Sequence, residues 1–520
     1  MITAGKSIRL QSPTNLLMIR AFFILALTLL PSPLIAKRPN ILFAISDDQS
    51  WIHTSAYGCT SVKTPAFDRV AKSGVLFTQA IAASPGCSPC RAAILTGRNT
   101  WEIKHAGTHA SYFDPRFPVF PKLLEQAGYV VGATGKLWGP GNWKHLGFKR
   151  NPAGPEFNQI KNKPPFSGLR STDYAANFEA FLEQCEDEAP FFFWYGASEP
   201  HRKYEKGSGL KAGKDLKSTV VPPFLPDHDE IKSDVLDYLV EVEWFDSHLG
   251  KMLDLLEKRG ELNNTLVIVT SDNGMPFPRA KANNYEYGIH LPLAISWPEQ
   301  VPGGRTVSDL IQFIDYAPTM LEAAEIPIAT TASGRSMLSL LRSPASDSLR
   351  VEMDRNAAYS ARERHSSSRW NNLAYPIRSL RTHEHLLIWN VKPDRWPAGA
   401  PQKFHANNQL GPMHGGYHDI DACPSLTYLL EGRNDPEISK FFHLAVDRRP
   451  EFELFDVVKD PGNLTNLANL PTHQNVKNRL VSQLKEHLKK TGDPRVLGYG
   501  DVWETYKRVS SIRRFPKPTP

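Results

Sequence analysis

The stretch Asn40-Ile-Leu-Phe-Ala-Ile-Ser-Asp47-Asp48 joins an apolar run to two adjacent acidic residues. An apolar run without polar alternation predicts a strand at 40–45 that is buried on both faces, as in the interior of a parallel sheet. Because open parallel sheets bind ligands outside the carboxyl ends of their strands, we expect the acidic pair at a binding edge. The stretch thus predicts both a fold class and the location of a site.

Further strands and helices alternate along the chain after this stretch. Such alternation predicts an α/β fold with a large, mostly parallel sheet sandwiched by helices. The expected strands are 129–133, 191–195, 266–269 and 292–297. Apolar residues at helical spacing, together with helix-ending glycines, predict helices near 65–73, 118–127, 178–185 and 233–259.

The organisation of the chain changes after Leu341, where the strands become shorter and more polar. Short strands at 386–390 and 452–455, followed by a closing helix at 476–490, predict a smaller C-terminal α+β subdomain. The expected parts are a main catalytic domain, this subdomain and a frayed tail, at 37–345, 346–512 and 513–520.

The first 36 residues have the pattern of a targeting segment. The apolar run 21–30 follows Arg20, precedes a proline-containing stretch that ends at Ala36, and is too short to span a bilayer. This arrangement predicts a secretory signal peptide at 1–36, and therefore an exported protein. An uncleaved anchor is the alternative, because Leu34 is a poor residue ahead of the cleavage site.

The composition excludes several classes of protein. The 520 residues carry 61 basic and 54 acidic side chains, a net charge of +7, which is too weak over this length to indicate a nucleic-acid partner. The chain has no internal repeat or low-complexity segment. Five cysteines are an odd number and too few for a disulfide scaffold. Nothing in the sequence indicates an oligomeric state.

Two of the predicted strands end in residues that carry side-chain oxygens. Asp47 and Asp48 follow the strand 40–45, and Asp272 and Asn273 follow the strand 266–269. Carboxylate and amide oxygens suit Ca²⁺, with Mg²⁺ as the alternative, and carboxylates this close would repel one another without a cation. Each pair alone is also typical of a turn or helix cap, so the predicted metal site depends on both pairs converging.

The segment from Cys87 to Arg98 is the most informative part of the sequence. Its Cys-x-x-Cys spacing fits a redox pair or half of a zinc site, but no thioredoxin-like strand precedes it and no second ligand pair exists. The pattern Cys87-x-Pro89-x-Arg91-(x)5-Gly97-Arg98 instead resembles the sulfatase signature, in which the first cysteine is oxidised to Cα-formylglycine. A phosphoesterase of the related alkaline phosphatase-like fold is disfavoured, because serine or threonine usually replaces the cysteine there.

The resemblance to sulfatases covers nearly all of the chain after residue 37. The matching motifs, in order, are Arg38-Pro-Asn-Ile-Leu, Thr134-Gly-Lys136, Pro200-His201, Leu266-Val-Ile-Val-Thr-Ser-Asp272-Asn-Gly274 and Glu453-Leu-Phe-Asp456-(x)3-Asp460-Pro-(x)4-Asn466-Leu-Ala468. They imply an alkaline phosphatase-like fold. Three segments are similar to the N-sulfoglucosamine sulfohydrolase subgroup: Asp272-Asn-Gly-Met-Pro-Phe-Pro278, Glu199-Pro-His-Arg202 and Ala374-Tyr-Pro-Ile-Arg378-Ser.

The resemblance also implies a catalytic role for individual residues. Formylglycine made from Cys87 by a formylglycine-generating enzyme would be the nucleophile, and it would share the metal with the four oxygen-bearing residues at the strand ends. Arg91 would orient this nucleophile, and His201 would protonate the leaving group. Lys136 and Lys281 would bind the sulfate oxygens, with Arg279 as the rival of Lys281.

Two departures from the family pattern affect the expected chemistry. Position 90 is often serine and is Cys90 here, so a Cys87–Cys90 disulfide would block maturation. Many sulfatases have Lys-x-His where this chain has Lys136-Leu-Trp138, so a histidine near the nucleophile is missing. Either His105 or His109 compensates, or another base acts in the second half of the reaction.

The implied substrate is a sulfated glycan. Mixed charges from both domains suit an aminosugar with sulfate and a neighbouring uronate, and the candidate substrate residues are Glu199, Arg202, Glu363, His365 and Arg378. The first hypothesis is hydrolysis of the N-sulfate of a terminal glucosamine in heparan-type chains. An O-sulfatase for another sulfated polysaccharide, or a non-catalytic sulfoglycan-binding homologue, are the alternatives.

Overall fold

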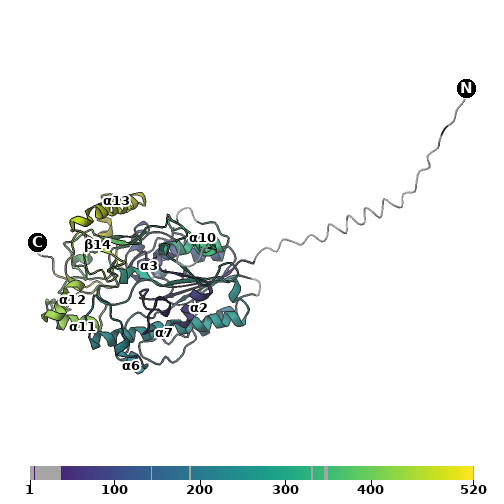
Figure 1. Ribbon diagram of the computed structural model, residues 1–520, viewed down its shortest axis with the longest axis horizontal. Helices are drawn as coiled ribbons and strands as arrows, with labels where there is room; N and C mark the ends of the chain where they lie inside the picture. Colours follow the sequence, from purple (N-terminus) through teal and green to yellow (C-terminus); the bar gives the residue numbers. More distant parts are fainter. Residues whose placement is uncertain are drawn as a thin grey trace. The chain divides into compact units, whose positions relative to one another are not determined.

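The computed structural model describes residues 5, 37–141, 143–186, 189–328, 332–344 and 350–518 (Figure 1). Residues from Arg38 onward form one compact unit. The expected signal peptide, 1–36, lies outside the described residues apart from Gly5. Within the described ranges, no helix combines the length and the apolar character needed to cross a membrane.

A seven-stranded sheet forms the centre of this unit, in the order β4-β5-β1-β6-β8-β2-β9. β1 lies between β5 and β6 and is parallel to both, and β4 is parallel to β5. β8, the strand expected at 292–297, is antiparallel to β6 and β2. The predicted large, mostly parallel sheet is confirmed. The strands are Asn40–Ser46 (β1), Val75–Phe77 (β2), Val130–Gly135 (β4), Phe191–Gly196 (β5), Thr265–Ser271 (β6), Leu293–Ser296 (β8) and Arg305–Val307 (β9).

Helices cover both faces of this sheet because the side chains of β1 alternate between two hydrophobic cores. Ile41, Phe43 and Ile45 pack into one core, which also contains residues of α3, α4, α9 and α10. Leu42 and Ala44 pack into the other, with α2, α5 and α7. Figure 1 shows α7 and α10 on opposite sides of the sheet. The helices are Pro65–Ser73 (α2), Cys87–Thr96 (α3), Phe120–Gln126 (α4), Tyr174–Leu182 (α5), Asp229–Lys258 (α7), Tyr316–Ala323 (α9) and Leu338–Arg342 (α10).

A separate four-stranded antiparallel sheet forms the C-terminal region, in the order β11-β12-β13-β14. Residues of α13 pack against it in a further hydrophobic core. The strands are Ala358–Arg362 (β11), Ile377–Arg381 (β12), His385–Asn390 (β13) and Phe452–Asp456 (β14), and the helices are Pro424–Glu431 (α11), Pro436–Val446 (α12), Gln474–Lys490 (α13) and Val502–Thr505 (α14). The predicted smaller α+β region is therefore present.

Short elements connect these two sheets. Three two-residue strands form a small sheet in the order β10-β3-β7. They are Ala80–Ile81 (β3), His290–Leu291 (β7) and Ile311–Gln312 (β10), and two short helices are Ser208–Lys211 (α6) and Glu286–Ile289 (α8).

The C-terminal tail is more ordered than the sequence suggested. Phe515 is buried, and the backbone N–H of Arg513 donates to the Ser367 hydroxyl. The N–H of Phe404 donates to the carbonyl oxygen of Arg514. The expected fraying therefore does not apply to the described part of the tail, up to residue 518, because an aromatic side chain anchors it.

Backbone hydrogen bonds continue past the ends of the central strands and fix the loops that carry the polar residues. The N–H of Asp47 donates to the carbonyl of Glu199 at 2.9 Å, and the N–H of Asp272 donates to that of Ser46 at 3.2 Å. The N–H of Lys136 donates to Gly196, where an added Cβ would lie 2.0 Å from the Lys136 carbonyl oxygen. Only glycine allows this close approach.

A buried carboxyl group on α7 makes the stability of the fold depend on pH. Glu241 is buried near Gly168, and its Oε2 has no hydrogen-bond partner among the described residues. Burial, together with the charge of Glu199, raises the pKa of Glu241 to about 9. Glu241 is therefore protonated at neutral pH in the folded protein, whereas the unfolded chain releases this proton near pH 4.

Glu241→Gln is expected to stabilise the protein at pH 8 and to leave its stability unchanged at pH 4. Above the unfolded-state pKa, the folded protein binds one more proton than the unfolded chain, so wild-type stability falls as pH rises toward 9. The neutral amide removes this loss, and we expect the free energy of unfolding to rise by about 2 kcal/mol at pH 8. Urea unfolding at several pH values measures it, with the exposed Glu179→Gln as control. An equal gain at pH 4 and pH 8 would contradict the expectation.

Candidate active site

The segment that begins at Cys87 forms the buried helix α3. Cys87 is the first residue of α3, Gly86 precedes it in extended conformation, and Gly97 ends the helix with φ of 65°. All five cysteines, including Cys87 and Cys90, are free thiols, so no disulfide blocks position 87. Burial raises the pKa of the Cys87 thiol, which leaves it protonated and a poor nucleophile as cysteine.

The four oxygen-bearing residues at the ends of β1 and β6 do converge. The N–H of Asp48 donates to Asp272 at 3.2 Å, and the amide of Asn273 donates to Asp48 at 2.7 Å. Ligand atoms of Asp47, Cys87 and Asp272 all lie within 4.8 Å of one another. The ends of two parallel strands and the start of α3 therefore meet at one point, as the sequence predicted.

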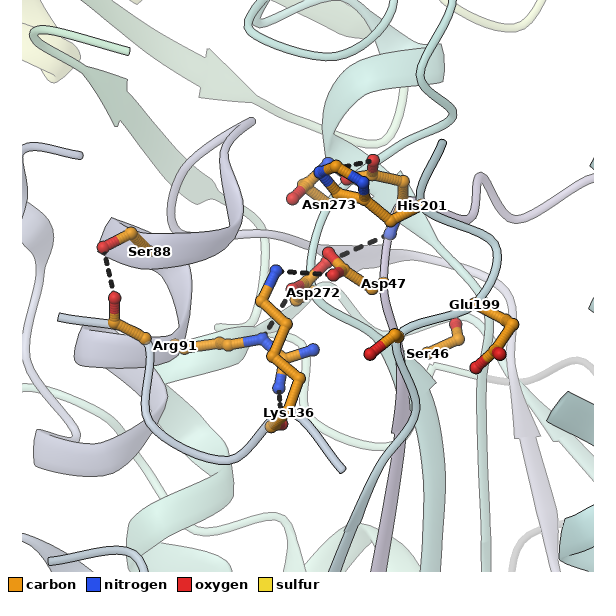
Figure 2. Close-up of polar contacts among 12 residues, drawn as sticks. Ser46, Asp47, Ser88, Arg91, Lys136, Glu199, His201, Asp272 and Asn273 are labelled. Atoms are coloured by element: carbon orange, nitrogen blue, oxygen red, sulfur yellow. Dashed lines mark hydrogen bonds and ion pairs between the residues drawn. The ribbon is translucent and has the colours of Figure 1, made fainter. Parts of the chain in front are cut away.

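Three buried or partly buried cations surround these carboxylates, and Figure 2 shows two of them, Arg91 and Lys136. Arg91 donates through Nε to Asp272 at 2.6 Å and through Nη1 to the carbonyl oxygen of Lys136. Lys136 forms an ion pair with Asp47. Lys281 forms one with Asp48 at 2.6 Å. Each cation thus pairs with a different carboxylate of the cluster.

The position of Arg279 settles which basic residue lies in the cluster. Its guanidinium donates to the carbonyl oxygens of Leu444 and Asn463 and lies over the ring of Tyr285. Arg279 therefore faces the C-terminal region, and Lys281 alone of the two reaches the carboxylates.

The protonation of the cluster follows from burial and charge. Burial and the charge of Asp47 raise the pKa of Asp272 to about 6. Burial acts in the same direction on Asp47, but the charges of Lys136, His201 and Arg91 outweigh it and hold the pKa of Asp47 well below its usual range. Lys136, despite its burial, has a raised pKa because Asp47 stabilises its charge. The cluster is therefore strongly polarised, with one carboxylate firmly ionised and another close to protonation.

The donor set fits a divalent cation. Asp47 Oδ1 and Asn273 Oδ1 are buried and have no hydrogen-bond partner in the described part of the chain. Orphaned, buried oxygen atoms are costly unless a ligand satisfies them, and hard oxygen ligands are those that Ca²⁺ and Mg²⁺ prefer. Asp47, Asp48, Asp272 and Asn273 are therefore suited to hold such an ion.

His201 lies at the open side of the cluster (Figure 2). Its Nδ1 donates to the carbonyl oxygen of Arg202 at 2.7 Å, which directs Nε2 toward Asp48 at 3.9 Å. The side chain is 37% exposed, so a bound molecule can reach it. A histidine fixed at one nitrogen and free at the other is arranged to exchange a proton with a ligand.

Four of the five candidate substrate residues form internal contacts instead. Glu199 accepts from Tyr174 and from the backbone of Arg170, and Figure 2 shows it pointing away from the cluster. Arg202 forms a double hydrogen bond with Asp234 at 2.6 and 2.9 Å. Buried ion pairs of this kind hold loops in place and leave no free polar atoms for a ligand.

Glu363 and Arg378 belong to another buried ion-pair network. Arg378 pairs with Glu363 at 2.8 Å and with Asp493. Arg495 completes the network by pairing with Glu363 at 2.7 Å. The sequence showed the charges but not these pairings, and Asp493 and Arg495 lie more than 100 residues away along the chain. Both residues therefore stabilise the C-terminal region rather than line the cluster.

His365, the fifth candidate, does lie beside the start of α3. A Cβ on Gly86 would be 2.9 Å from its Nδ1. Its ring centroid is 5.4 Å from that of His109. Burial, together with the charges of His365, Arg508, Lys136 and Lys281, lowers the pKa of His109, and its Nδ1 is buried without a partner among the described residues. A pair of neutral imidazoles therefore borders the cluster.

The structure separates the two histidines that were considered as replacements for the missing one at position 138. His105 stacks on Tyr506 with ring centroids 4.0 Å apart. Trp138 donates to the carbonyl of Pro140 and packs its ring against Phe113. His109 is thus the histidine near the lysines of the cluster, and His105 is part of an aromatic contact.

Asp421 is a residue of this site that sequence reasoning missed. Its carboxylate lies 3.0 Å from Lys281 Nζ. Ligand atoms of Asp48, His201 and Asp421 lie within 4.8 Å of one another. Asp421 lies between β13 and α11 in an irregular segment, where no periodicity or motif distinguishes it from other exposed acids.

Two family models match this chain. The sulfatase model matches residues 39–326, and the model of the N-sulphoglucosamine sulphohydrolase C-terminal region matches residues 280–391. Human N-sulphoglucosamine sulphohydrolase is 27% identical over 505 residues, which cover 90% of this chain and 93% of that protein. An ulvan-active sulfatase from Formosa agariphila is 27% identical over 493 residues, which cover 88% of this chain and 76% of that protein.

Solved structures share the fold. One, a protein in complex with its substrate D-glucosamine-2-N,6-O-disulfate, has a TM-score of 0.64 at 20% identity, covering 88% of this chain and 99% of that one. A 2-O GAG sulfatase has a TM-score of 0.60 at 16% identity, covering 88% of this chain and 93% of that one. These likenesses confirm the expected alkaline phosphatase-like fold.

Calcium is expected to raise the melting temperature of the protein by several degrees. The cation satisfies the orphaned oxygens and offsets the repulsion among the carboxylates, and an ion at about 100 times its Kd stabilises by about 2.7 kcal/mol. Differential scanning fluorimetry after treatment with a chelator, with and without added Ca²⁺, measures the shift.

Asp272→Asn is expected to remove most of this calcium-dependent shift. Asp254→Asn, which changes an exposed acid on α7, serves as the control and should retain the shift. An undiminished shift in the Asp272 variant would place the calcium elsewhere.

Proposed function

This chain belongs to the sulfatase family and is a hydrolase acting on sulfate esters or sulfamates of sulfated glycans, and we propose that its substrate is the N-sulfate of a terminal glucosamine in heparan-type chains. The observation that carries the proposal is the position of Cys87, which starts α3 against Asp47 and Asp272 within reach of anion-binding cations. The match of the N-sulphoglucosamine sulphohydrolase C-terminal model supports the choice of substrate.

The proposed nucleophile is formylglycine made from Cys87 by a formylglycine-generating enzyme. This residue, together with a Ca²⁺ ion held by Asp47, Asp48, Asp272 and Asn273, supplies an activated oxygen nucleophile when both are present. Arg91 holds the site together by joining Asp272 to the backbone of Lys136. The backbone N–H groups at the start of α3 favour an anion beside position 87.

The remaining residues bind sulfate and move protons. Lys136, which follows β4, and Lys281, which follows β6, neutralise the charge on the sulfate oxygens. His201 delivers a proton through Nε2 to the leaving nitrogen or oxygen, since its Nδ1 is occupied by the Arg202 carbonyl. His109 serves as the base in the second half of the reaction, with His365 beside it.

An O-sulfatase acting on another sulfated polysaccharide is the second candidate. The ulvan-active sulfatase from Formosa agariphila is as similar to this chain, at 27% identity, as the human N-sulphoglucosamine sulphohydrolase. The metal and nucleophile residues would serve either substrate, because both reactions transfer the same sulfuryl group. The non-catalytic alternative requires that Cys87 stays unmodified.

We propose that the protein is exported after removal of residues 1–36. The apolar run 21–30 and the Ala36 cleavage position support this proposal. Export would bring the protein to sulfated glycans outside the cytoplasm.

The peptide containing Cys87 is expected to be about 18 Da lighter than its cysteine form in the mature protein. Oxidation of the thiol to an aldehyde replaces one sulfur and two hydrogen atoms with one oxygen atom, and mass spectrometry of a tryptic digest resolves the difference. Cys90 is the internal control and should stay a free thiol. Unmodified Cys87 in protein made alongside a formylglycine-generating enzyme would favour the non-catalytic alternative.

A desulfation panel separates the two candidate substrates. The mature enzyme is expected to release sulfate from D-glucosamine N-sulfate faster than from glucosamine 6-O-sulfate or from sulfated galactans. Ion chromatography of the released sulfate gives the rates. Release only from O-sulfated sugars would overturn the proposed substrate and leave the hydrolase assignment intact.

His109→Ala is expected to lower kcat by about 100-fold and to lower KM with it, so that kcat/KM, which reports only the steps up to release of the sugar, changes little. Because His109 is proposed to act after the sugar leaves, the first turnover should still release about one sugar per enzyme in a burst. Added imidazole should restore part of the rate. His105→Ala is the matched control and should stay within about twofold of wild type; a loss of the burst in the His109 variant would contradict the assigned step.

A further inference from the structure

Asp421 places a negative charge at the mouth of a site that binds an anion. Its side chain is 31% exposed, and those of Lys136 and His201 are 26% and 37% exposed. The carboxylates of Asp47, Asp48 and Asp272, by contrast, are almost fully buried. A ligand that enters the site therefore meets Asp421, Lys136 and His201 before it reaches the interior. Because Asp421 repels sulfate, a favourable contact with another part of the ligand is needed to offset this repulsion.

The segment that carries Asp421 is held firmly on its N-terminal side. Asp419 accepts hydrogen bonds from Arg362 and from Arg369, the latter at 2.6 Å. It also accepts from the backbone N–H of Ser366 at 2.9 Å. All three partners lie on or just after β11, so the segment is fastened to the C-terminal sheet two residues before Asp421.

The C-terminal side of the segment is fastened to α7. Ser425, in the first turn of α11, donates through its hydroxyl to Asp234 at 2.6 Å and through its N–H at 3.2 Å. Cys423 caps α11 by accepting from the N–H of Leu426. Asp421 therefore projects from a short span whose two ends are anchored in different parts of the fold.

The same Asp234 also fixes the proton-exchanging histidine. It forms the double hydrogen bond with Arg202, the residue whose carbonyl oxygen holds His201 Nδ1. One buried carboxylate thus sets the positions of His201 and of the Asp421 segment together. A carboxylate held this rigidly beside a proton donor has the preorganisation of a recognition group.

The chemistry of Asp421 restricts what it recognises. The Asp421 carboxylate forms an ion pair with the Lys281 ammonium at 3.0 Å, and an ionised carboxylate only accepts hydrogen bonds. Sulfate offers acceptors alone, so Asp421 cannot bind it. A sugar ring offers hydroxyl donors next to the carbon that carries the sulfate. These donors are the groups that a carboxylate at the mouth would bind.

We propose that Asp421 determines specificity by accepting a hydrogen bond from a ring hydroxyl of the sugar that carries the sulfate. This inference rests on the proposed sulfoglycan substrate. Asp421 distinguishes a sulfated sugar from other sulfates: it attracts the ring through the hydroxyl and repels an anion that has no such donor. Removing its charge therefore has opposite effects on these two kinds of ligand.

The test compares inorganic sulfate with D-glucosamine N-sulfate in wild type and Asp421→Asn. The amide keeps the shape of the side chain and can still accept from Lys281. Isothermal titration calorimetry gives both Kd values even without turnover, and steady-state kinetics gives KM for the sugar and the inhibition constant for sulfate. We expect sulfate to bind about threefold tighter and the sugar about tenfold weaker in the variant.

Two further variants control for indirect effects. Asp394→Asn changes an exposed acid of the C-terminal region and should leave both constants unchanged. Asp421→Ala should weaken sugar binding at least as much as the amide does. Equal changes in the Kd values of both ligands in the same direction would overturn the inference, because they would mean that Asp421 acts only through Lys281.

The experiment also separates a failure of this inference from a failure of the proposed N-sulfate substrate. If wild type binds and hydrolyses only an O-sulfated sugar, the N-sulfate proposal fails. The same two-ligand comparison with that sugar then tests Asp421. Changes of opposite sign in the Kd values of the sugar and of sulfate would support the inference, and changes of the same sign would overturn it.

Discussion

Repulsion among carboxylates at the ends of neighbouring strands is the constraint on which the site depends. β1 and β6 are parallel and adjacent, so Asp47, Asp48 and Asp272 are forced together in a region that water does not reach. Low polarity strengthens this repulsion. The positive charges of Arg91, on α3, and of the two lysines that pair with the other carboxylates reduce this repulsion within the protein. Asp47 Oδ1 and Asn273 Oδ1 remain without a hydrogen-bond partner among the described residues and are available to a metal ion. The arrangement of helices and loops around the sheet provides these charges.

The sheet was predictable because its signals are local. The continuous apolar run at 40–45 needs no distant partner to be recognised, and the oxygen-bearing residues directly follow such runs. The motif that begins at Cys87 is contiguous as well, so its sequence alone was enough to predict a nucleophile at this position. The local pattern did not give the direction of every strand. β8 pairs antiparallel with β6, and the residues 292–297 carry no information about the direction in which a strand runs.

The substrate side of the site was less predictable, since it depends on pairings between distant residues. Arg202 and Arg378 have the charges that a sulfated sugar requires, but Asp234 and Asp493 bind them instead. Nothing near either arginine in the sequence indicates these partners. Asp421 was missed for the converse reason: it looks like an ordinary exposed acid until the fold brings Lys281 and His201 beside it.

The burial of Cys87 restricts its proposed modification to the period before the protein has folded. The residue is 5% exposed and starts a helix whose ten residues all lie in the interior. Once the protein has folded, this burial keeps the Cys87 thiol out of reach of a modifying enzyme. The conversion proposed for Cys87 would therefore compete in time with the docking of α3. The fraction of molecules that become active would then be a kinetic quantity, fixed by which process is faster while the chain is still unfolded.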